Sequence, residues 1–414
     1  MLSAVPALHA PHRYHRPMPE SPPPAADAPR ARPARTTGTR ASSRRGTTAR
    51  SAARSGKVLP PPVLVEVRRG ELVESRHRGH VVQVDASGRL EQGIGDPEIE
   101  VTLRSAVKPF ALVALVESGA ADDLRLSHSE LAVMAASHTG EDMHVRTLQA
   151  VFRRAGVTQA LLACGTAGMP LDQVTATRLA RQGEAAGPIR HMCSGFHAAS
   201  ILLSRYSDWS LEDYDRPDHP SQVACRSAVA RVFGQRPGAL HTAVDDCGLA
   251  TFAFPLVDIA RAFALLADPA GVASDPARSA MAPALTRIRD AMLASPEMVG
   301  GNGEVLDTRL MRAKPGRLVS KSGAEGLRGV GLLPGARGPT SGAAGLALRI
   351  EDGDGFARAA RSVTVEALSQ LNALSDQELR SLSAHHQPQV RSAAGSVVAQ
   401  SVPDFVLAPI SELV

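Results

Sequence analysis

The chain has 414 residues, of which 43% are hydrophobic, and a formal net charge of +5. This length allows two or three domains of average size or one large α/β domain, and it is enough to bury a sizeable core. No apolar run approaches the roughly 18 residues that a membrane span needs, so a membrane-spanning protein is not expected.

The positive charge is concentrated in residues 1–57, which carry 11 Lys or Arg against 2 Asp or Glu. The rest of the chain holds 35 of the 46 basic and 39 of the 41 acidic residues, a net charge of −4. Segment 1–57 is rich in Arg, Pro and Ala and has little apolar surface to offset its ordering entropy, so we expect a disordered tail. Its arginines are not interleaved with aromatic residues from position 20 onward, so nucleic-acid binding is not expected.

The tail also contains a pair that resembles a twin-arginine export signal, Arg44 and Arg45. The sequence after them, GTTARSAARSGK, lacks the apolar segment that export requires. Four cysteines in a chain of this length fit a reducing compartment, where they serve as ligands, nucleophiles or core residues rather than as a disulfide framework. A cytoplasmic location is therefore expected.

The folded part is expected to begin near Val63, where apolar and polar residues start to alternate. Gly-containing breaks interrupt this pattern at residues 69–70, 78–79 and 87–88. The pattern predicts three short antiparallel strands. Strand patterns return at residues 317–323 and 345–355.

Helical patterns dominate the middle of the chain. Ser127 and Glu130 form a capping box for a helix over 127–136. Other helices are expected at 110–118 before Gly119, within 141–185 with breaks at Gly156 and GTAGMPLD, and at 218–234, 255–295 and 356–373. Sheet at the ends and helix in the middle predict an α+β domain, or α/β sandwich, in which an antiparallel sheet carries a helical lobe. This domain is expected to span 58–375, followed by a C-terminal extension, 376–414, that ends in a candidate strand.

The stretch LRSAVKPF places Ser105 and Lys108 three residues apart, directly before Pro109. Residues at i and i+3 share a helix face, and the proline pins the pair to a first turn, where backbone N–H groups are unpaired. A serine nucleophile needs a base, and a lysine serves as one when burial or another cation lowers its pKa. Because a lone SxxK also occurs at ordinary helix entrances, this pair by itself leaves catalysis open.

Two later stretches add to the pair. AASHTGED places Ser137 and His138 after an apolar helix, and LVSKSGAEG places Lys321 at the end of a predicted strand. This order of SxxK, Ser-containing loop and Lys-Ser-Gly is similar to that of penicillin-binding proteins and serine β-lactamases. A closer resemblance, over about residues 63–370, is to the bacterial asparaginase II family, the thermolabile rhizobial-type L-asparaginases. The phrases that carry it are LRSAVKPFALVALVESGA, AASHTGEDMHV, CGTAGMPLD, MCSGFHAAS, VDDCGLATFAFPL and MVGGNGEVLDTRLMRAKPGRLVSKSGAEG.

The resemblance implies a serine β-lactamase-like fold, a homodimer and the hydrolysis of L-asparagine to L-aspartate and ammonia. Ser105 with Lys108 would match one Ser-Lys set of the family, and Ser137 with Lys321 the second. If the two lysines lie close, repulsion lowers the pKa of one and supplies a neutral amine. Ser105 would then attack the side-chain amide, although the resemblance leaves open which serine is acylated and whether glutamine replaces asparagine.

The resemblance also implies substrate contacts from Arg104 and Asp245. His138 is a further candidate for a substrate contact, because it directly follows Ser137 in the chain.

A zinc site built from two cysteines and a lysine is a further feature of the family. Cys193 and Cys247 match the two cysteines, but Phe196 stands where the family has lysine. Phenylalanine cannot ligate a metal, so His197 and water would have to complete a tetrahedral zinc site. The alternative is that both cysteines are free thiols beside the active site. Zinc therefore stays open, and no nucleotide or organic cofactor is expected.

Two other functions also stay open. An SxxK acyl-transferring hydrolase of β-lactams or peptidoglycan peptides has similar motifs, but its substrates lie outside the cytoplasm and no export signal is evident. A non-catalytic amino-acid-binding or regulatory protein would fit the loss of the metal lysine. The presence of two complete Ser-Lys sets opposes this last function, because a binding module needs neither.

Overall fold

The computed structural model describes residues 60–272, 276–355 and 357–409. The predicted tail at 1–57 lies outside the described residues, and so does its Arg44-Arg45 pair. Among the described helices, none combines the length and the apolarity that crossing a bilayer requires.

The main sheet of the described chain has nine strands, and each pairing in it is antiparallel. Its path runs β10-β11-β1-β2-β9-β8-β7, with β3 beside β2 and β12 beside β3. The strands are β1 (Val63–Arg69), β2 (Leu72–Asp85), β3 (Leu90–Ile94), β7 (Leu318–Ser322), β8 (Leu327–Leu332), β9 (Ala344–Ile350), β10 (Gln389–Arg391), β11 (Val397–Pro403) and β12 (Ala408–Pro409).

A smaller sheet in the order β4-β6-β5 lies near the start of the first helix. Its strands are β4 (Glu100–Thr102), β5 (His241–Val244) and β6 (Ala250–Pro255). Sequence patterning missed this sheet, and it also missed β8.

Strand β2 is longer than predicted, because it continues through the expected break at residues 78–79. A Cβ on Gly79 would lie 2.1 Å from the carbonyl oxygen of Arg349 on β9, so this glycine permits close strand approach instead of a turn. The N-terminal half of β2 pairs with β1, and the C-terminal half pairs with β3 and β9. The breaks at 69–70 and 87–88 are confirmed.

Beyond residue 375, the strands β10, β11 and β12 join the main sheet, after the short helices α15 and α16. β11 pairs with β1 over four residue pairs, from Val65 with Pro403 to Arg68 with Gln400. The expected domain boundary at residue 375 therefore falls inside one continuous structural unit of the described chain.

Most of the helices expected from the sequence pattern are present, but those at 194–206 and 306–313 were not predicted. The helices are α1 (Lys108–Ala111), α2 (Val113–Glu117), α3 (Ala120–Asp123), α4 (His128–Met134), α5 (Asp142–Ala155), α6 (Gln173–Gln182), α7 (Ser194–Tyr206), α8 (Pro220–Val232), α9 (Leu256–Ala267), α10 (Pro269–Val272), α11 (Pro276–Ala294), α12 (Pro296–Gly300), α13 (Leu306–Ala313), α14 (Ala359–Gln370), α15 (Asp376–Ser381) and α16 (Ser383–His386). Short 3₁₀ turns are η1 (Arg104–Val107), η2 (Gln159–Leu161), η3 (Pro188–Arg190) and η4 (Pro237–Ala239). The capping box of Ser127 and Glu130 begins α4, and Gly156 ends α5 with a positive φ of 66°.

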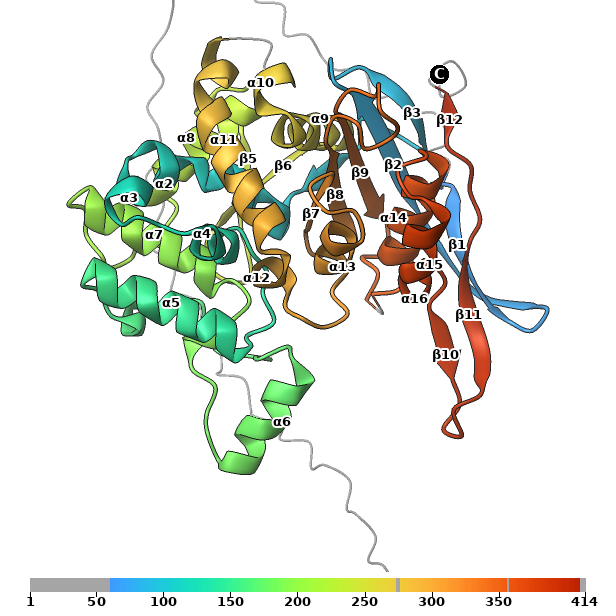
Figure 1. Ribbon diagram of the computed structural model, residues 1–414, viewed down its shortest axis with the longest axis horizontal. Coiled ribbons are helices and arrows are strands. Elements are labelled where there is room, and N and C mark those ends of the chain that lie inside the picture. Colours follow the sequence, from blue (N-terminus) through green and yellow to red (C-terminus); the bar gives the residue numbers. More distant parts are fainter. Residues whose placement is uncertain (1–59, 273–275, 356, 410–414) are drawn as a thin grey trace, which may run out of the picture. The chain divides into compact units, whose positions relative to one another are not determined.

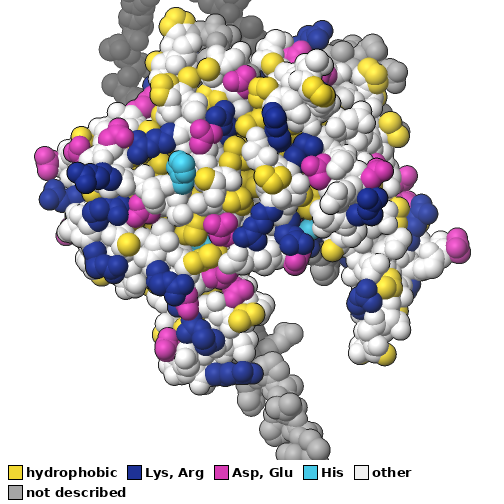
Figure 2. Space-filling model, viewed as in Figure 1, with side chains coloured by type: hydrophobic (Ala, Val, Ile, Leu, Met, Phe, Trp, Pro, Cys, Tyr) yellow, Lys and Arg dark blue, Asp and Glu magenta, His cyan; other side chains and the backbone are white. Residues whose placement is uncertain are grey.

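Helix and sheet occupy different parts of the domain (Figure 1). The helical lobe, which comprises α1–α8, α11 and α12, lies beside the main sheet. Helix α9 packs on β2, β8 and β9, while α14 packs on β1, β9 and β11. The predicted α+β fold with an antiparallel sheet and a helical lobe is confirmed. The face shown in Figure 2 has Lys and Arg side chains interspersed with Asp and Glu, so it offers a polyanion no uniformly positive surface.

Gly345 on β9 is a point of very close approach between α9 and the sheet. A Cβ there would lie 1.9 Å from the carbonyl oxygen of Ala260 and 2.7 Å from the backbone nitrogen of Ala264. Because backbone atoms must move to make room, we expect Gly345→Ala to lower the free energy of unfolding by about 3 kcal/mol in urea denaturation. Gly342→Ala is the control, since its Cβ would make an ordinary 3.5 Å contact with Ala86. Equal stability of the two variants would contradict this packing.

Candidate active site

The candidate site forms where the first helical turn of the lobe meets the edge strand of the main sheet. The backbone nitrogen of Leu103 donates to the carbonyl oxygen of Phe252 on β6 at 2.8 Å, which anchors η1 to the small sheet. A Cβ on Gly323, just after β7, would lie 2.5 Å from the carbonyl oxygen of Leu103. The glycine of the Lys-Ser-Gly motif thus lets the strand end approach η1 closely. Ser105 lies in η1, and Lys108 begins α1 with Pro109 in its first turn, as predicted.

Two lysines converge on one serine. Lys321 Nζ on β7 donates to Ser137 Oγ at 2.9 Å, and Lys108 Nζ donates to the same oxygen at 3.3 Å. Only four lysines occur in the whole sequence. The structure therefore brings together three of the four predicted catalytic side chains, although Ser137 and Lys321 are 184 positions apart in the chain.

The two lysine side chains are both buried. Burial is the main reason that the pKa of Lys321 falls from its usual 10.5 to about 7. Asp307 opposes this change, and repulsion by Lys108 adds to it. Sequence analysis expected repulsion to produce the neutral amine; in the structure burial contributes more. Lys321 is thus a base that is partly neutral near pH 7.

Lys108 directs its hydrogen bonds toward Ser137 and away from Ser105. Its Nζ donates to the carbonyl oxygen of Ala136 at 2.7 Å and contacts Cys193 Sγ at 3.2 Å, besides its bond to Ser137. These three contacts match the three donors of an ammonium group. The SxxK spacing therefore places Lys108 near the helix start without pairing it to the serine of the same motif.

Ser105 faces a cavity of about 670 Å³. Within the described chain, no hydrogen bond joins Ser105 Oγ to another group, so the hydroxyl is available to a ligand. The cavity is lined by Arg104, Ser105, Ala163, Cys164, Gly165, Thr166, Ala167, Met169, His191, Met192, Cys193, Asp245, Asp246, Cys247, Gly248 and Ala324. Its walls combine apolar side chains and thiols with a small charged group.

That charged group consists of one guanidinium and two carboxylates. Arg104 Nε donates to Asp245 Oδ1 at 2.7 Å, and Arg104 Nη2 donates to Asp246 Oδ2 at 2.5 Å. Arg104 has a positive φ of 49°, a backbone strain that the surrounding contacts must hold in place. Arg104 and Asp245 were predicted to contact substrate, and both line the cavity. Asp246 was missed, although it directly follows Asp245 in the phrase VDDCG.

His138 does not line the cavity, contrary to the substrate contact predicted for it. Its side chain is fully buried, with Nε2 2.9 Å from Ser194 Oγ and Nδ1 accepting from the backbone nitrogen of Gly140 at 3.1 Å. Its ring stacks on that of His144 at 4.6 Å, and burial holds its pKa well below the usual value. Adjacency to Ser137 was misleading, because the ring of His138 is buried and both of its nitrogens have partners within the protein. His191, for which the sequence analysis predicted no role, lines the cavity.

Cys193 and Cys247 meet at the base of the cavity. The interaction between the two thiols, together with Lys108 and His191, lowers the pKa of Cys193, and the same interaction raises that of Cys247. Phe196 is buried on α7, and His197 pairs through Nδ1 with the hydroxyl of Tyr214 at 2.7 Å. Among the described residues, no third His, Cys, Asp or Glu joins the two cysteines in a cluster able to hold a metal.

This donor set does not fit a closed zinc site. A structural zinc takes four ligands, and a catalytic zinc takes three protein ligands and a water. The two thiols supply only two, and the phenyl ring of Phe196 supplies none. Cys164 also lines the cavity, but burial raises its pKa to about 12 and its Sγ is directed to the carbonyl oxygen of Pro188 at 3.4 Å.

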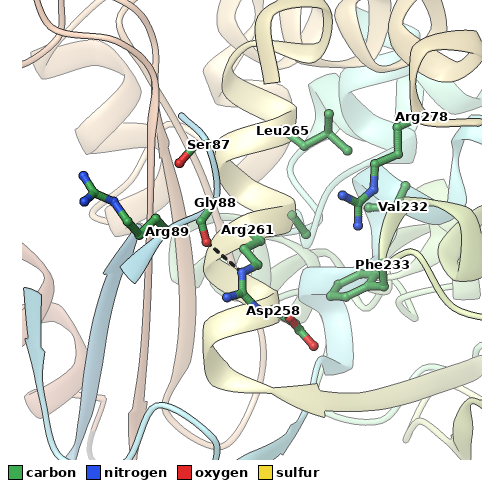
Figure 3. A pocket seen from close by; sticks show the side chains of 10 residues that line it. Ser87, Gly88, Arg89, Val232, Phe233, Asp258, Arg261, Leu265 and Arg278 are labelled. Carbon is green, nitrogen blue, oxygen red and sulfur yellow. Dashed lines mark hydrogen bonds and ion pairs between the residues drawn. The ribbon is translucent and has the colours of Figure 1, made fainter. Parts of the chain in front are cut away.

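A second cavity, of about 290 Å³, lies against α9 (Figure 3). Arg261 donates there to the carbonyl oxygen of Gly88 at 2.8 Å and to Asp258 at 2.7 Å. Ser87 is at its edge, but no lysine lines it. No lysine lines the cavity at Ser105 either, but Cys193 in its wall lies 3.2 Å from Lys108 Nζ, so that cavity adjoins the lysine pair and the chemistry is assigned to it.

Comparison with known proteins gives one family match. A family model described as L-asparaginase II matches residues 65–403. A solved structure, a probable glutaminase from Bacillus subtilis complexed with 6-diazo-5-oxo-L-norleucine, is 12% identical with a TM-score of 0.35, covering 72% of this chain and 85% of that chain. Another, described as Mglu, is 14% identical with a TM-score of 0.33, covering 72% and 67%. No curated protein matches.

Proposed function

This chain belongs to the L-asparaginase II family, and on that basis we propose that it hydrolyses the side-chain amide of L-asparagine to L-aspartate and ammonia. The observation that carries the proposal is the convergence of Lys108 and Lys321 on Ser137 Oγ, with Lys108 Nζ also 3.2 Å from Cys193, which lines the cavity together with Ser105. A Ser-Lys amidohydrolase needs this set of a hydroxyl nucleophile, a neutral amine and a hydroxyl between them.

The charged group in the cavity supports a free amino acid as substrate. An α-amino acid carries a carboxylate and an ammonium group side by side. Arg104 offers a guanidinium that can hold a carboxylate through two hydrogen bonds, and Asp245 and Asp246 offer acceptors for an ammonium group. Substrate binding at this position would direct the side-chain amide toward Ser105.

Ser105 is the proposed nucleophile because it faces the cavity, whereas Ser137 is held between the two lysines. Its Oγ forms a bond to the amide carbon while its proton passes through Ser137 Oγ to the Lys321 amine. The backbone N–H groups of Ser105 and Ala324 donate no hydrogen bond within the described chain and border the same cavity, so they can stabilise the oxyanion.

Collapse of this intermediate breaks the carbon–nitrogen bond. The departing nitrogen takes the proton back from the lysine network and leaves as ammonia. A water molecule then attacks the ester of Ser105, the same network accepts and returns a proton, and aspartate is released.

Ammonia release by the purified protein tests this proposal. We expect release from both amides, with kcat/KM for L-asparagine about 10-fold or more above that for L-glutamine, because one methylene in a confined site changes transition-state binding by that order. The same assay after prolonged EDTA treatment is expected to give the same rate, since the cysteine pair lacks a third ligand.

Three other outcomes would change the proposal. Faster release from glutamine would reassign the substrate, and loss of activity on chelation would return a metal to the site. Release from neither amide, with turnover of a chromogenic cephalosporin, would favour the β-lactam type of SxxK hydrolase.

A further inference from the structure

One buried carboxylate near the active site has no role in the steps described so far. Asp307 lies in the first turn of α13, and its side chain is only 3% exposed. Burial opposes ionisation, yet the charges of Arg328 and Lys321 and the hydrogen bonds from two serines lower its pKa to about 2. Asp307 is therefore an anion enclosed in the protein, and such a group is costly unless its contacts compensate.

Its contacts are made to the residues on either side of Lys321. Asp307 Oδ1 accepts from Ser320 Oγ at 2.6 Å, and Oδ2 accepts from the backbone nitrogen of Ser322 at 3.0 Å and from Ser322 Oγ at 2.6 Å. Arg328 on the neighbouring strand β8 donates to Oδ1 at 2.5 Å. All four hydrogen bonds thus go to the end of β7 and to the strand that pairs with it.

Strand geometry converts these contacts into an orientation for Lys321. Side chains alternate along a strand, so Ser320 and Ser322 point to one side of β7 and Lys321 to the other. Lys321 pairs across the sheet with Gly329. A Cβ on Gly329 would lie 1.8 Å from the ring of Phe263, so this face of the sheet is the one that α9 covers. The lysine consequently lies on the face opposite Asp307.

Lys321 extends from that face to Ser137. Its Nζ is held by Ser137 Oγ at 2.9 Å and by the carbonyl oxygen of Ser322 at 2.7 Å. The charges that act on it come from four elements: Asp307 on α13, Lys108 on α1, Cys193 before α7 and Arg328 on β8. Asp307 is the largest of these charges in its effect, and it favours the protonated form.

We propose that Asp307 is a positioning residue for the amidohydrolase reaction, because it fixes both neighbours of Lys321 from the far side of the strand and so holds the amine against Ser137. This inference rests on the proposed function. Asp307, in the segment EVLDTRLM, would thus contribute to the reaction without contacting the substrate.

The test replaces Asp307 with asparagine, which keeps the shape and removes the charge. We expect kcat for L-asparagine to fall about 10- to 100-fold with KM changed less than about 3-fold, since a displaced base affects the transition state more than binding. We also expect the acidic limb of the pH profile to move down by about one pH unit, because the anion that favours protonated Lys321 is gone. Asp354→Asn is the control.

Asp354 suits this purpose because it is a buried carboxylate with only a structural task. It accepts hydrogen bonds from the backbone nitrogens that begin α14, including those of Ala359 and Ala360, and it is not among the charges that act on Lys321. Its replacement is expected to change stability alone. A lower rate with an unmoved pH profile in Asp307→Asn would show a merely structural role and overturn the inference.

A second measurement does not depend on activity. Protein labelled with ¹³C-lysine has four lysines to resolve, and the Lys321 signal is identified by its loss in Lys321→Met. The titration midpoint of Lys321 is expected to be lower in Asp307→Asn than in wild type and Asp354→Asn. If Asp307→Asn fails to fold because Arg328 is left unpaired, the double variant Asp307→Asn/Arg328→Gln removes both charges and is expected to show a smaller shift of the same sign.

The two measurements separate the two proposals. No ammonia release by wild type from either amide overturns the proposed function. An unchanged Lys321 titration in the charge-removed variant overturns the present inference, whether or not the enzyme is active.

Discussion

Replacing Ser105 with alanine is expected to lower ammonia release from L-asparagine by about 10⁴-fold or more, because it removes the serine hydroxyl of the cavity on which the proposed acyl-enzyme forms. Ser105 Oγ makes no hydrogen bond within the described chain and faces open space. The variant should therefore keep the thermal stability of the wild type, and the loss should appear in kcat.

The matched variant is Ser137→Ala. Ser137 Oγ receives hydrogen bonds from Lys108 and Lys321, so its removal breaks the proton path but leaves the proposed nucleophile in place. Intact-mass spectrometry after exposure to a diazoketone analogue of asparagine distinguishes the two serines. We expect a covalent adduct in wild type, a slower adduct in Ser137→Ala and none in Ser105→Ala. An adduct that persists in Ser105→Ala and disappears in Ser137→Ala would exchange their roles.

Replacing Lys321 with methionine is the second change with a large expected effect. Methionine fills nearly the same volume but cannot accept a proton, and general-base catalysis typically contributes about 10²- to 10⁴-fold. We expect a loss of that size in kcat. In wild type, kcat/KM should rise with pH through about 7, where the buried amine loses its proton. A wild-type rate that is flat between pH 6 and 8 would contradict the assignment of Lys321 as the base.

The same variant also has an expected effect on stability. The pKa of Lys321 is depressed in the folded state, from 10.5 to about 7, so the unfolded chain binds more protons between these values. Wild type consequently loses stability from this group as the pH falls from about 10.5 to about 7, and Lys321→Met does not. As the pH falls from about 10.5 to about 7, urea denaturation should show the stability of Lys321→Met rising relative to that of wild type. Below about pH 7 this difference in stability should be constant. A constant difference across the whole window would mean that the amine is not buried as described.

Near neutral pH, Lys321→Met is expected to lower activity and to raise stability relative to wild type. These opposite signs distinguish loss of the base from unfolding of the variant. A variant that is inactive because it is unfolded would lose both activity and stability. A variant that loses the base should lose activity while its relative stability improves toward pH 7.

Local structure was predictable from the sequence wherever neighbouring residues decide it. The capping box of Ser127 and Glu130 specifies the start of α4, and Gly156 specifies the end of α5, because both act within one helical turn. The break expected at Gly79 was wrong for the opposite reason. A glycine in a turn and a glycine under a neighbouring strand look alike in sequence, and only the position of Arg349 on β9 separates them.

The residues of the active site show the same difference between features set by neighbouring residues and features set by distant contacts. Ser105, Lys108, Ser137 and Lys321 were recognisable because short motifs carry them, and Arg104 and Asp245 were found with them. His138 was assigned to the substrate because it follows Ser137, whereas its ring is buried and paired with Ser194.

Two further residues of the site carried no local signal. In the sequence Asp246 looks like any acidic residue in a turn, and only its contact with Arg104 in the structure identifies it as part of the site. Asp307 differs from a helix-start carboxylate only through its contacts with β7.

The sequence by itself therefore determined the type of fold and most of its helices, since these depend on local spacing, and it contained the short motifs that carry Ser105, Lys108, Ser137 and Lys321. The tertiary structure decided that both lysines meet at Ser137 and that Ser105 alone of the two serines faces the cavity. It also decided that burial lowers the pKa of Lys321 to about 7. These outcomes depend on distances between segments up to 184 positions apart and on the removal of water from around an amine, and neither is encoded in any short stretch of chain.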